Sequence, residues 1–121
     1  MTSAPPFDAA RALRQACETF DIEAAAVAGL KNRLTEAFAR SVQLMLNVRG
    51  RVVVMGMGKS GHVGRKIAAT LASTGTPAMF VHPGEASHGD LGMLEPRDIV
   101  LAIANSGESS EITILLPVLK R

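Results

Sequence analysis

An apolar segment that ends in a glycine-rich turn constrains this chain's fold most strongly. Residues 52–64 read VVVMGMGKSGHVG, so a β-branched run leads directly into closely spaced glycines with a lysine and a serine among them. An apolar run without alternation favours a strand buried on both faces. Helical spacing returns in residues 59–74. This order predicts a parallel α/β unit whose turn lets an anion approach the backbone.

The segments that follow extend the same pattern. PAMFV (77–81) and IVLAIA (99–104) are expected to be strands, and SSEITILLPVLKR (109–121) is expected to open another helix. A glycine- and proline-rich connection with one short helical turn is expected between the two strands. We therefore expect a doubly wound parallel α/β sheet, truncated to about three strands. In the helix over 59–74, one face is expected to carry Val63, Ile67, Ala68 and Leu71.

The region before this sheet is helical in period from residue 8 to about residue 47. One apolar stripe starts at Leu13 and a second starts at Leu30, each with spacings of three or four residues. Asp21 or Gly29 is expected to interrupt the helix. We expect an N-terminal helical segment over 1–48 and the first half of a larger α/β domain over 49–121.

Composition narrows the possible classes of partner. The 121 residues contain four Phe and neither Trp nor Tyr, and the net charge is only +2 without a basic block. Both features argue against nucleic-acid binding. A single cysteine excludes an internal disulfide framework and fits a reducing, cytoplasmic setting. Neither a signal peptide nor a membrane-length apolar run is visible, so no membrane partner is expected.

The glycine turn has three possible anionic ligands. Gly56, Gly58 and Gly61 match the dinucleotide pattern G-x-G-x-x-G between a strand and a helix. That pattern also needs an acidic residue at the tip of the second strand, and Glu85 lies beyond that tip. The pattern of a nucleoside-triphosphate loop matches less well than the dinucleotide pattern, because its first glycine would fall at Val53, inside the strand.

A sugar phosphate is the third possible ligand, and a second turn supports this interpretation. Residues 105–111, NSGESSE, follow the third strand, where hydroxyls of Ser106, Ser109 and Ser110 can hold a phosphate together with free N–H groups at a helix start. Turns at the carboxyl ends of parallel strands should converge on one crevice. Ser109 or Ser110 can instead serve only as a helix cap.

Four motifs in this order resemble the sugar isomerase (SIS) domain of the arabinose-5-phosphate isomerases. The motifs are GMGKSGH, STGTPA, HP-x-EA-x-HGDLG and NSGESSE, and the resemblance covers roughly residues 20–121. It implies the flavodoxin-like SIS fold and an oligomeric enzyme, a tetramer in relatives, that interconverts D-ribulose 5-phosphate and D-arabinose 5-phosphate. In Gram-negative bacteria this reaction supplies 3-deoxy-octulosonate for lipopolysaccharide.

The same resemblance also implies parts that this sequence does not include. Family members usually continue through the rest of the SIS domain and two cystathionine-β-synthase modules, and further catalytic positions lie in that continuation. We therefore expect this polypeptide alone to be inactive or nearly so.

Aldose–ketose isomerisation needs a base, an electrophile and a phosphate anchor, with no metal or organic cofactor required in principle. Glu111 is the candidate base, although a glutamate in a first helical turn is favoured by the helix dipole anyway. Lys59 is the candidate electrophile for the carbonyl or the enediolate. A lysine at a helix start is disfavoured by the dipole, which suggests that it is used. The resemblance implies catalytic relevance for both positions.

Other site residues are weaker candidates. Ser60 either binds the phosphate or merely begins the helix, and His62 is expected to pack or cap. The resemblance implies substrate contacts at Gly75, Thr76, His82, His88 and Ile114. Gly75 and Thr76 can also form a simple turn, and Ile114 can be helix core. His82 is further implied to bind zinc, which would be inhibitory or incidental since the chemistry can run without it. Two histidines are in any case too few for a closed zinc site.

Two other functions remain open from the sequence. SIS domains also act as non-catalytic sugar-phosphate sensors behind a basic DNA-reading helix, although residues 1–48 show no clear helix of that kind. A dinucleotide-binding domain is the less favoured alternative, because its acidic residue is missing at the second strand tip.

Overall fold

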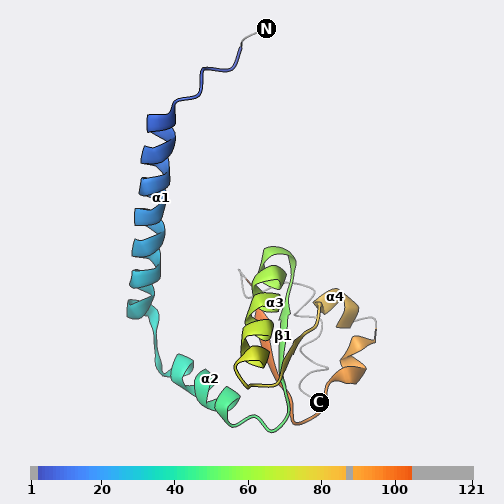
Figure 1. Cartoon of the computed structure of the whole chain (residues 1–121). Helices are drawn as coiled ribbons and strands as arrows, with labels where there is room; N and C mark the ends of the chain where they lie inside the picture. The colour runs from blue at the N-terminus through green and yellow to red at the C-terminus, as the bar shows by residue number, and fades with distance from the viewer. Residues whose placement is uncertain (1–2, 87–88, 105–121) are drawn as a thin grey trace. The chain divides into compact units, whose positions relative to one another are not determined.

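The computed structural model describes residues 3–86 and 89–104 of the chain (Figure 1). It divides into two compact units, Met1–Arg40 and Ser41–Arg121. The elements follow in the order α1 (Ala9–Gly29), η1 (Leu30–Arg33), α2 (Glu36–Leu46), β1 (Val52–Gly56), α3 (Gly58–Ser73), β2 (Ala78–Phe80), α4 (Pro83–Ala86), η2 (Asp90–Met93) and β3 (Ile99–Ile103). The expected alternation of strands and helices is confirmed in the part of the chain that the structure describes.

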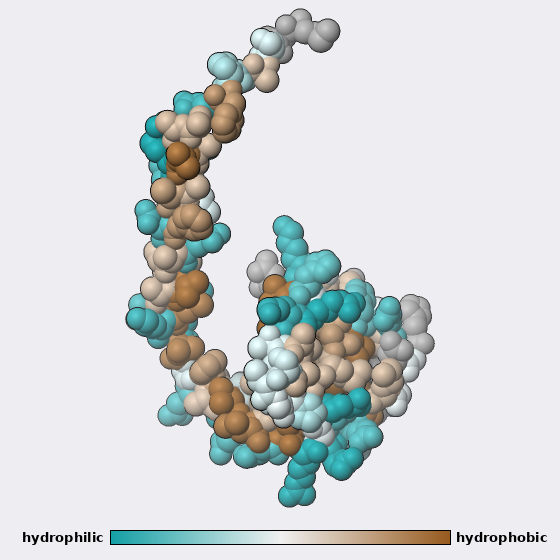
Figure 2. Space-filling view, viewed as in Figure 1, coloured by the Kyte–Doolittle hydropathy of each residue, from teal (hydrophilic) through white to brown (hydrophobic). Residues whose placement is uncertain are grey.

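The first unit consists mainly of helix α1. Its N-cap is Asp8, whose carboxylate accepts a hydrogen bond from the Arg11 backbone N–H at 3.0 Å. The helix runs through Asp21 without a break and ends at Gly29, so Gly29 is the expected interruption that the structure confirms. Neither α1 nor η1 has a buried residue. Figure 2 accordingly shows hydrophobic and hydrophilic side chains together on the surface of α1.

The second unit is built on a parallel sheet in the order β2-β1-β3. In the central strand β1, Val54 pairs with Phe80 of β2 and with Leu101 of β3. Val53 and Met55 of β1 pack on one face of the sheet with Val81 and Ala86, while the other face carries Val52, Val54 and Ala68. The strand is therefore buried on both faces, as its unbroken apolar sequence predicts.

Helix α3 approaches this sheet closely because glycines face it. A Cβ on Gly61 would lie 2.7 Å from the Gly56 carbonyl oxygen, and one on Gly64 would lie 3.1 Å from both Val54 and Phe80. At Gly61 the Gly56 backbone would have to move, and at Gly64 the two side chains would have to shift by a few tenths of an ångström. Gly61 of the dinucleotide-like pattern thus has a packing reason, independent of any ligand.

A buried carboxylate joins the amino ends of β1 and β3. Asp98 accepts hydrogen bonds from the backbone N–H groups of Arg51 at 2.7 Å and Glu95 at 2.9 Å, and its side chain is only 2% exposed. Burial acts to raise the pKa of Asp98, but these bonds and the Arg51 guanidinium at 3.3 Å together hold the pKa below its ordinary value. This network lies at the end of the strands opposite to the glycine turn.

Candidate functional site

The glycine turn joins the carboxyl end of β1 to the start of α3. Gly58 has φ +55°, a left-handed conformation that suits glycine. The N-cap Met57 offers no side-chain hydrogen bond, and the first helical bond runs from Gly61 N–H to the Met57 carbonyl at 3.2 Å. The N–H groups of residues 58–60 therefore have no partner within the helix and can meet an acceptor.

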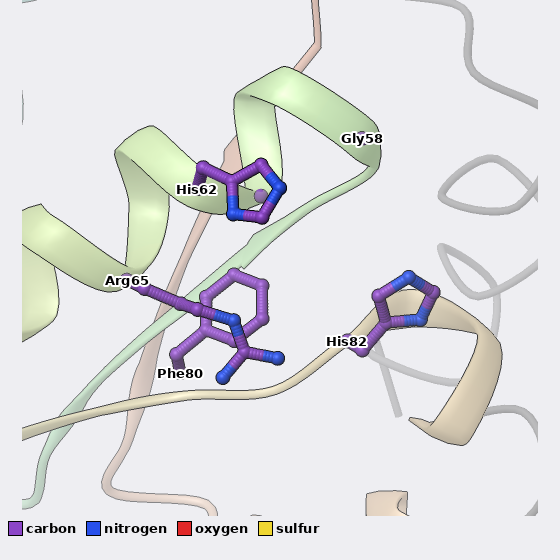
Figure 3. A pocket seen from close by; sticks show the side chains of 6 residues that line it. Gly58, His62, Arg65, Phe80 and His82 are labelled. Atoms are coloured by element: carbon purple, nitrogen blue, oxygen red, sulfur yellow. The ribbon is translucent and has the colours of Figure 1, made fainter.

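A hollow of about 200 Å³ opens beside this turn (Figure 3). One face of α3, at the spacing i, i+3, i+4 and i+7, forms one wall, and the carboxyl end of β2 with the residues after it forms the other. The guanidinium carbon of Arg65 lies 4.3 Å from the centroid of the Phe80 ring, a cation–π contact. Among the described residues, the lining is Gly58, Gly61, His62, Arg65, Phe80 and His82.

His82 has a fixed hydrogen-bonding role at one ring nitrogen. Its Nδ1 accepts the backbone N–H of Gly84 at 3.0 Å, so Nδ1 carries no proton and the neutral ring has its proton on Nε2. His82 therefore offers an N–H donor, which suits a hydroxyl or phosphate oxygen. A metal on Nε2 would require that proton to move and would break the bond to Gly84.

Lys59 and Ser60 lie in the first turn of α3, next to the hollow. Lys59 is exposed, and the ion pairs found in the described residues do not include it. Ser60 is half-buried. Because successive helical residues turn by about 100°, Ser60 lies roughly 140–160° around the helix from His62 and Arg65. Ser60 thus belongs to the flank of α3 that faces away from β2.

Gly75 and Thr76 lie at the far end of α3. The helix has 16 residues and is about 24 Å long. Gly75 has φ +104°, and Thr76 donates its N–H to the Leu71 carbonyl at 2.9 Å. Within one copy of the chain, the structure does not bring this pair together with Lys59 or the hollow.

Comparison with known proteins decides the family. The model of the SIS domain matches residues 45–121, more than half of the chain. The chain belongs to the SIS domain family. The resemblance expected from the four motifs is confirmed, and so is the α/β fold class with its three-stranded parallel sheet and N-terminal helices.

Individual relatives of this SIS domain agree in name. The arabinose 5-phosphate isomerase KdsD of Yersinia pestis is 64% identical over 104 residues, and that of Escherichia coli K12 is 62% identical over 104 residues. Each match covers 86% of this chain but 32% of the relative, so the chain spans about a third of their length. A solved protein of E. coli CFT073, in complex with A5P, is 42% identical with a TM-score of 0.88 and covers 94% of this chain and 61% of its own.

Several predicted site residues of the SIS domain lie outside the described residues. This group includes the candidate base, the serine turn and two substrate contacts, so their relation to Lys59 stays a prediction. The residues are His88, Ser106, Ser109, Ser110, Glu111 and Ile114.

Metal ligands and membrane segments were also sought in the SIS domain and the helices before it. Within residues 3–86 and 89–104, no group of three or more metal-ligating side chains occurs, so zinc at His82 also stays a prediction. Among the helices in these ranges, none has the length and apolar character to cross a membrane.

Sequence reasoning missed two residues of the hollow, Arg65 and Phe80. Their signal lies in spacing, because Arg65 follows Gly58 by seven positions and His62 by three, which places all three on one helix face. Phe80 ends the strand that reaches the same face. His62, expected to pack or cap, is exposed and lines the hollow.

Proposed function

We propose that this chain takes part in the interconversion of D-arabinose 5-phosphate and D-ribulose 5-phosphate as part of an arabinose-5-phosphate isomerase. One observation carries the proposal: Lys59 stands at the glycine turn beside a basic hollow, at the carboxyl ends of β1 and β2. The sequence around it is up to 64% identical to proteins named for this reaction. The solved neighbour in complex with A5P supports a sugar phosphate as the ligand.

The proposed reaction moves two protons and passes through an enediol. A base removes the proton from C2 of the open-chain aldose and returns it to C1, while the hydroxyl proton on the C2 oxygen moves to the C1 oxygen. Glu111 is our candidate for the base. Lys59 stabilises the negative charge that develops on the oxygens, since an ammonium at this point strengthens as the charge grows. The Nε2–H of His82 is a donor for a substrate oxygen.

The setting of the reaction follows from the same proposal. The enediol route requires no cofactor, and zinc at His82 is at most inhibitory, because the ring nitrogens are already assigned to Gly84 and to a donor role. We further propose a cytoplasmic homo-oligomer whose product feeds 3-deoxy-octulosonate and lipopolysaccharide synthesis. The name of the relatives, KdsD, agrees with that pathway.

An isomerase assay tests the function directly. Residues 1–121 are joined to the remaining two thirds of the Yersinia pestis relative, and conversion of D-arabinose 5-phosphate is followed by NMR in D2O, where passage through an enediol incorporates deuterium. We expect turnover comparable to that of the parent relative. A fusion that folds but does not convert the sugar, while the parent does, contradicts the proposal.

The role of Lys59 is tested in the same fusion. Lys59→Met is expected to lower kcat by about 100-fold or more, because it removes a charge that stabilises the enediolate. Lys66→Met is the matched control, since it removes an equal charge about two turns further along α3 without touching the hollow. Its kcat should stay within about twofold. Equal losses in both variants would show that Lys59 has no specific role.

A further inference from the structure

We propose that the hollow between α3 and β2 is a subsite for a phosphate monoester, with Arg65 as its principal ligand. The phosphate class follows from the hollow itself. The identity of the ester as a sugar phosphate rests on the proposed function.

The place of the hollow separates it from the predicted crevice. In the sheet order β2-β1-β3, the chain reverses direction across the sheet between β1 and β3, which is where a doubly wound fold places its main ligand crevice. The hollow lies on the other side, against β2, and Ser60 is on the opposite flank of α3. The subsite is therefore additional to the site that the glycine and serine turns predict.

The charge of the hollow points to an anion. Among the residues that the structure describes, Arg65 and two histidines line it, and no carboxylate does. The two ion pairs in the described parts of the chain, Arg51–Asp98 and Arg97–Glu95, leave Arg65 out. The sequence has no Asp or Glu between Glu36 and Glu85, so every charged side chain of α3 is positive, and β2 has no charged residue. An anion is the partner that compensates it.

The donors of the hollow are held in place before any ligand arrives. Arg65 lies flat across Phe80, as Figure 3 shows, with its guanidinium extended toward His82. A stacked guanidinium keeps its N–H groups free at its edge, where they match two phosphate oxygens. The Nε2–H of His82 supplies a further donor because Gly84 occupies Nδ1. The two segments that line the hollow thus each supply a donor.

The size of the hollow limits the ligand. About 200 Å³ lies below the range of roughly 300–1,000 Å³ that drug-sized ligands occupy. A phosphate group with a few attached carbons fits this space, whereas a whole dinucleotide does not. The hollow therefore selects a phosphate monoester rather than a larger nucleotide.

Calorimetric titration of the 121-residue chain with inorganic phosphate tests the subsite. We expect saturable binding that Arg65→Gln weakens by about 10–100-fold, since a hydrogen bond to a charged group is lost. Arg65→Lys keeps the charge but loses the paired N–H donors of the guanidinium. Its phosphate affinity should lie between that of the wild type and that of Arg65→Gln. Lys66→Gln is the matched control and should stay within about twofold. Circular dichroism checks that each variant is folded.

Three outcomes overturn the subsite. Unchanged phosphate affinity in folded Arg65→Gln and Arg65→Lys would do so, and so would an equal loss in Lys66→Gln. As a second readout, phosphate should shift the backbone amide resonances of Gly61 and Gly84 in the wild-type chain. A titration that leaves both resonances unmoved also contradicts the subsite.

A competition experiment identifies the source of the phosphate. If inorganic phosphate displaces D-arabinose 5-phosphate, the hollow holds the phosphate of the sugar itself. If both bind together, the hollow takes a second phosphorylated ligand. The isomerase proposal fails separately from the subsite. If phosphate binding depends on Arg65 but the fusion shows no turnover, the subsite is supported and only the isomerase proposal is contradicted.

Discussion

Helix α3 buries residues, whereas helix α1 buries none. Helix α1 carries large apolar residues, and Leu13, Phe20 and Ile22 are 69%, 70% and 69% exposed. Helix α3 buries Gly61, Gly64 and Ala68. Small residues let a helix backbone approach a sheet, and the burial then comes from the strand, where Val52, Val53 and Val54 are fully buried. Apolar content alone therefore does not identify the element that forms the core.

The two units should differ most in how much stability they lose when an aspartate replaces an apolar residue. Val54→Asp places a carboxylate in a fully buried position of β1, and we expect a loss of at least about 4 kcal/mol in the free energy of unfolding, enough to unfold the second unit. Phe20→Asp in α1 should cost less than about 1 kcal/mol. Urea titration followed by circular dichroism measures both. Similar losses at the two positions would remove the distinction.

Two glycine substitutions sharpen the comparison. Gly61→Ala forces a Cβ against the Gly56 carbonyl, which cannot move without shifting β1, and should cost about 3 kcal/mol. Gly29→Ala is its counterpart at the end of α1, where nothing lies within 4 Å of the added atom and φ is −65°. It should stabilise the helix by about 0.5–1 kcal/mol. The comparison fails if thermal unfolding shows that both substitutions change the stability in the same direction.

Replacing one aspartate in each unit should give the smallest difference in unfolding free energy between the two units. Asp98→Asn should lower the free energy of unfolding by about 2 kcal/mol, because it removes the charge that buried donors and Arg51 stabilise. Asp8→Asn, at the exposed cap of α1, should change it by less than about 0.5 kcal/mol, since Asn caps as well as Asp.

The pH dependence checks the same carboxylate. The folded-state pKa of Asp98 is lower than its unfolded value of 3.8, so its contribution is complete above pH 3.8. It is lost as the pH falls through the folded pKa. Wild-type stability should therefore decrease on acidification below about pH 4, and Asp98→Asn should flatten that decrease. An equally steep decrease in the variant would contradict the assignment.

Much of the fold could be predicted from residue order. The strand over 52–56 lies within one residue of its expected bounds, because an apolar run bounded by Arg51 and a glycine turn has few alternatives. The spacing places Val63 on one face of α3 with Ile67, Ala68 and Leu71, but it does not show how deeply each is buried: Val63 is 55% exposed. A hydropathy pattern gives weight to large residues and cannot register that Gly61 and Gly64 make the closest contact with the sheet.

The candidate site was predicted only in part. Lys59 and His82 could be found because each follows a strand end, where ligands gather in parallel sheets. The partnership of Arg65 with Phe80 depends on a contact between a helix and the next strand, which no local motif encodes. Gly75 and Thr76 belong to a motif that predicts substrate contact, yet they lie at the end of α3 that is far from the hollow.

The central claim is that the second unit, and not the helical unit before it, binds the sugar phosphate at the carboxyl ends of its parallel strands. Titration of the ¹⁵N-labelled chain with D-arabinose 5-phosphate tests this claim most directly. We predict saturable shifts at Gly58, Gly61 and Gly84, with residues 9–29 unchanged. Shifts confined to residues 9–29, or none at all at saturating sugar phosphate, would contradict the account.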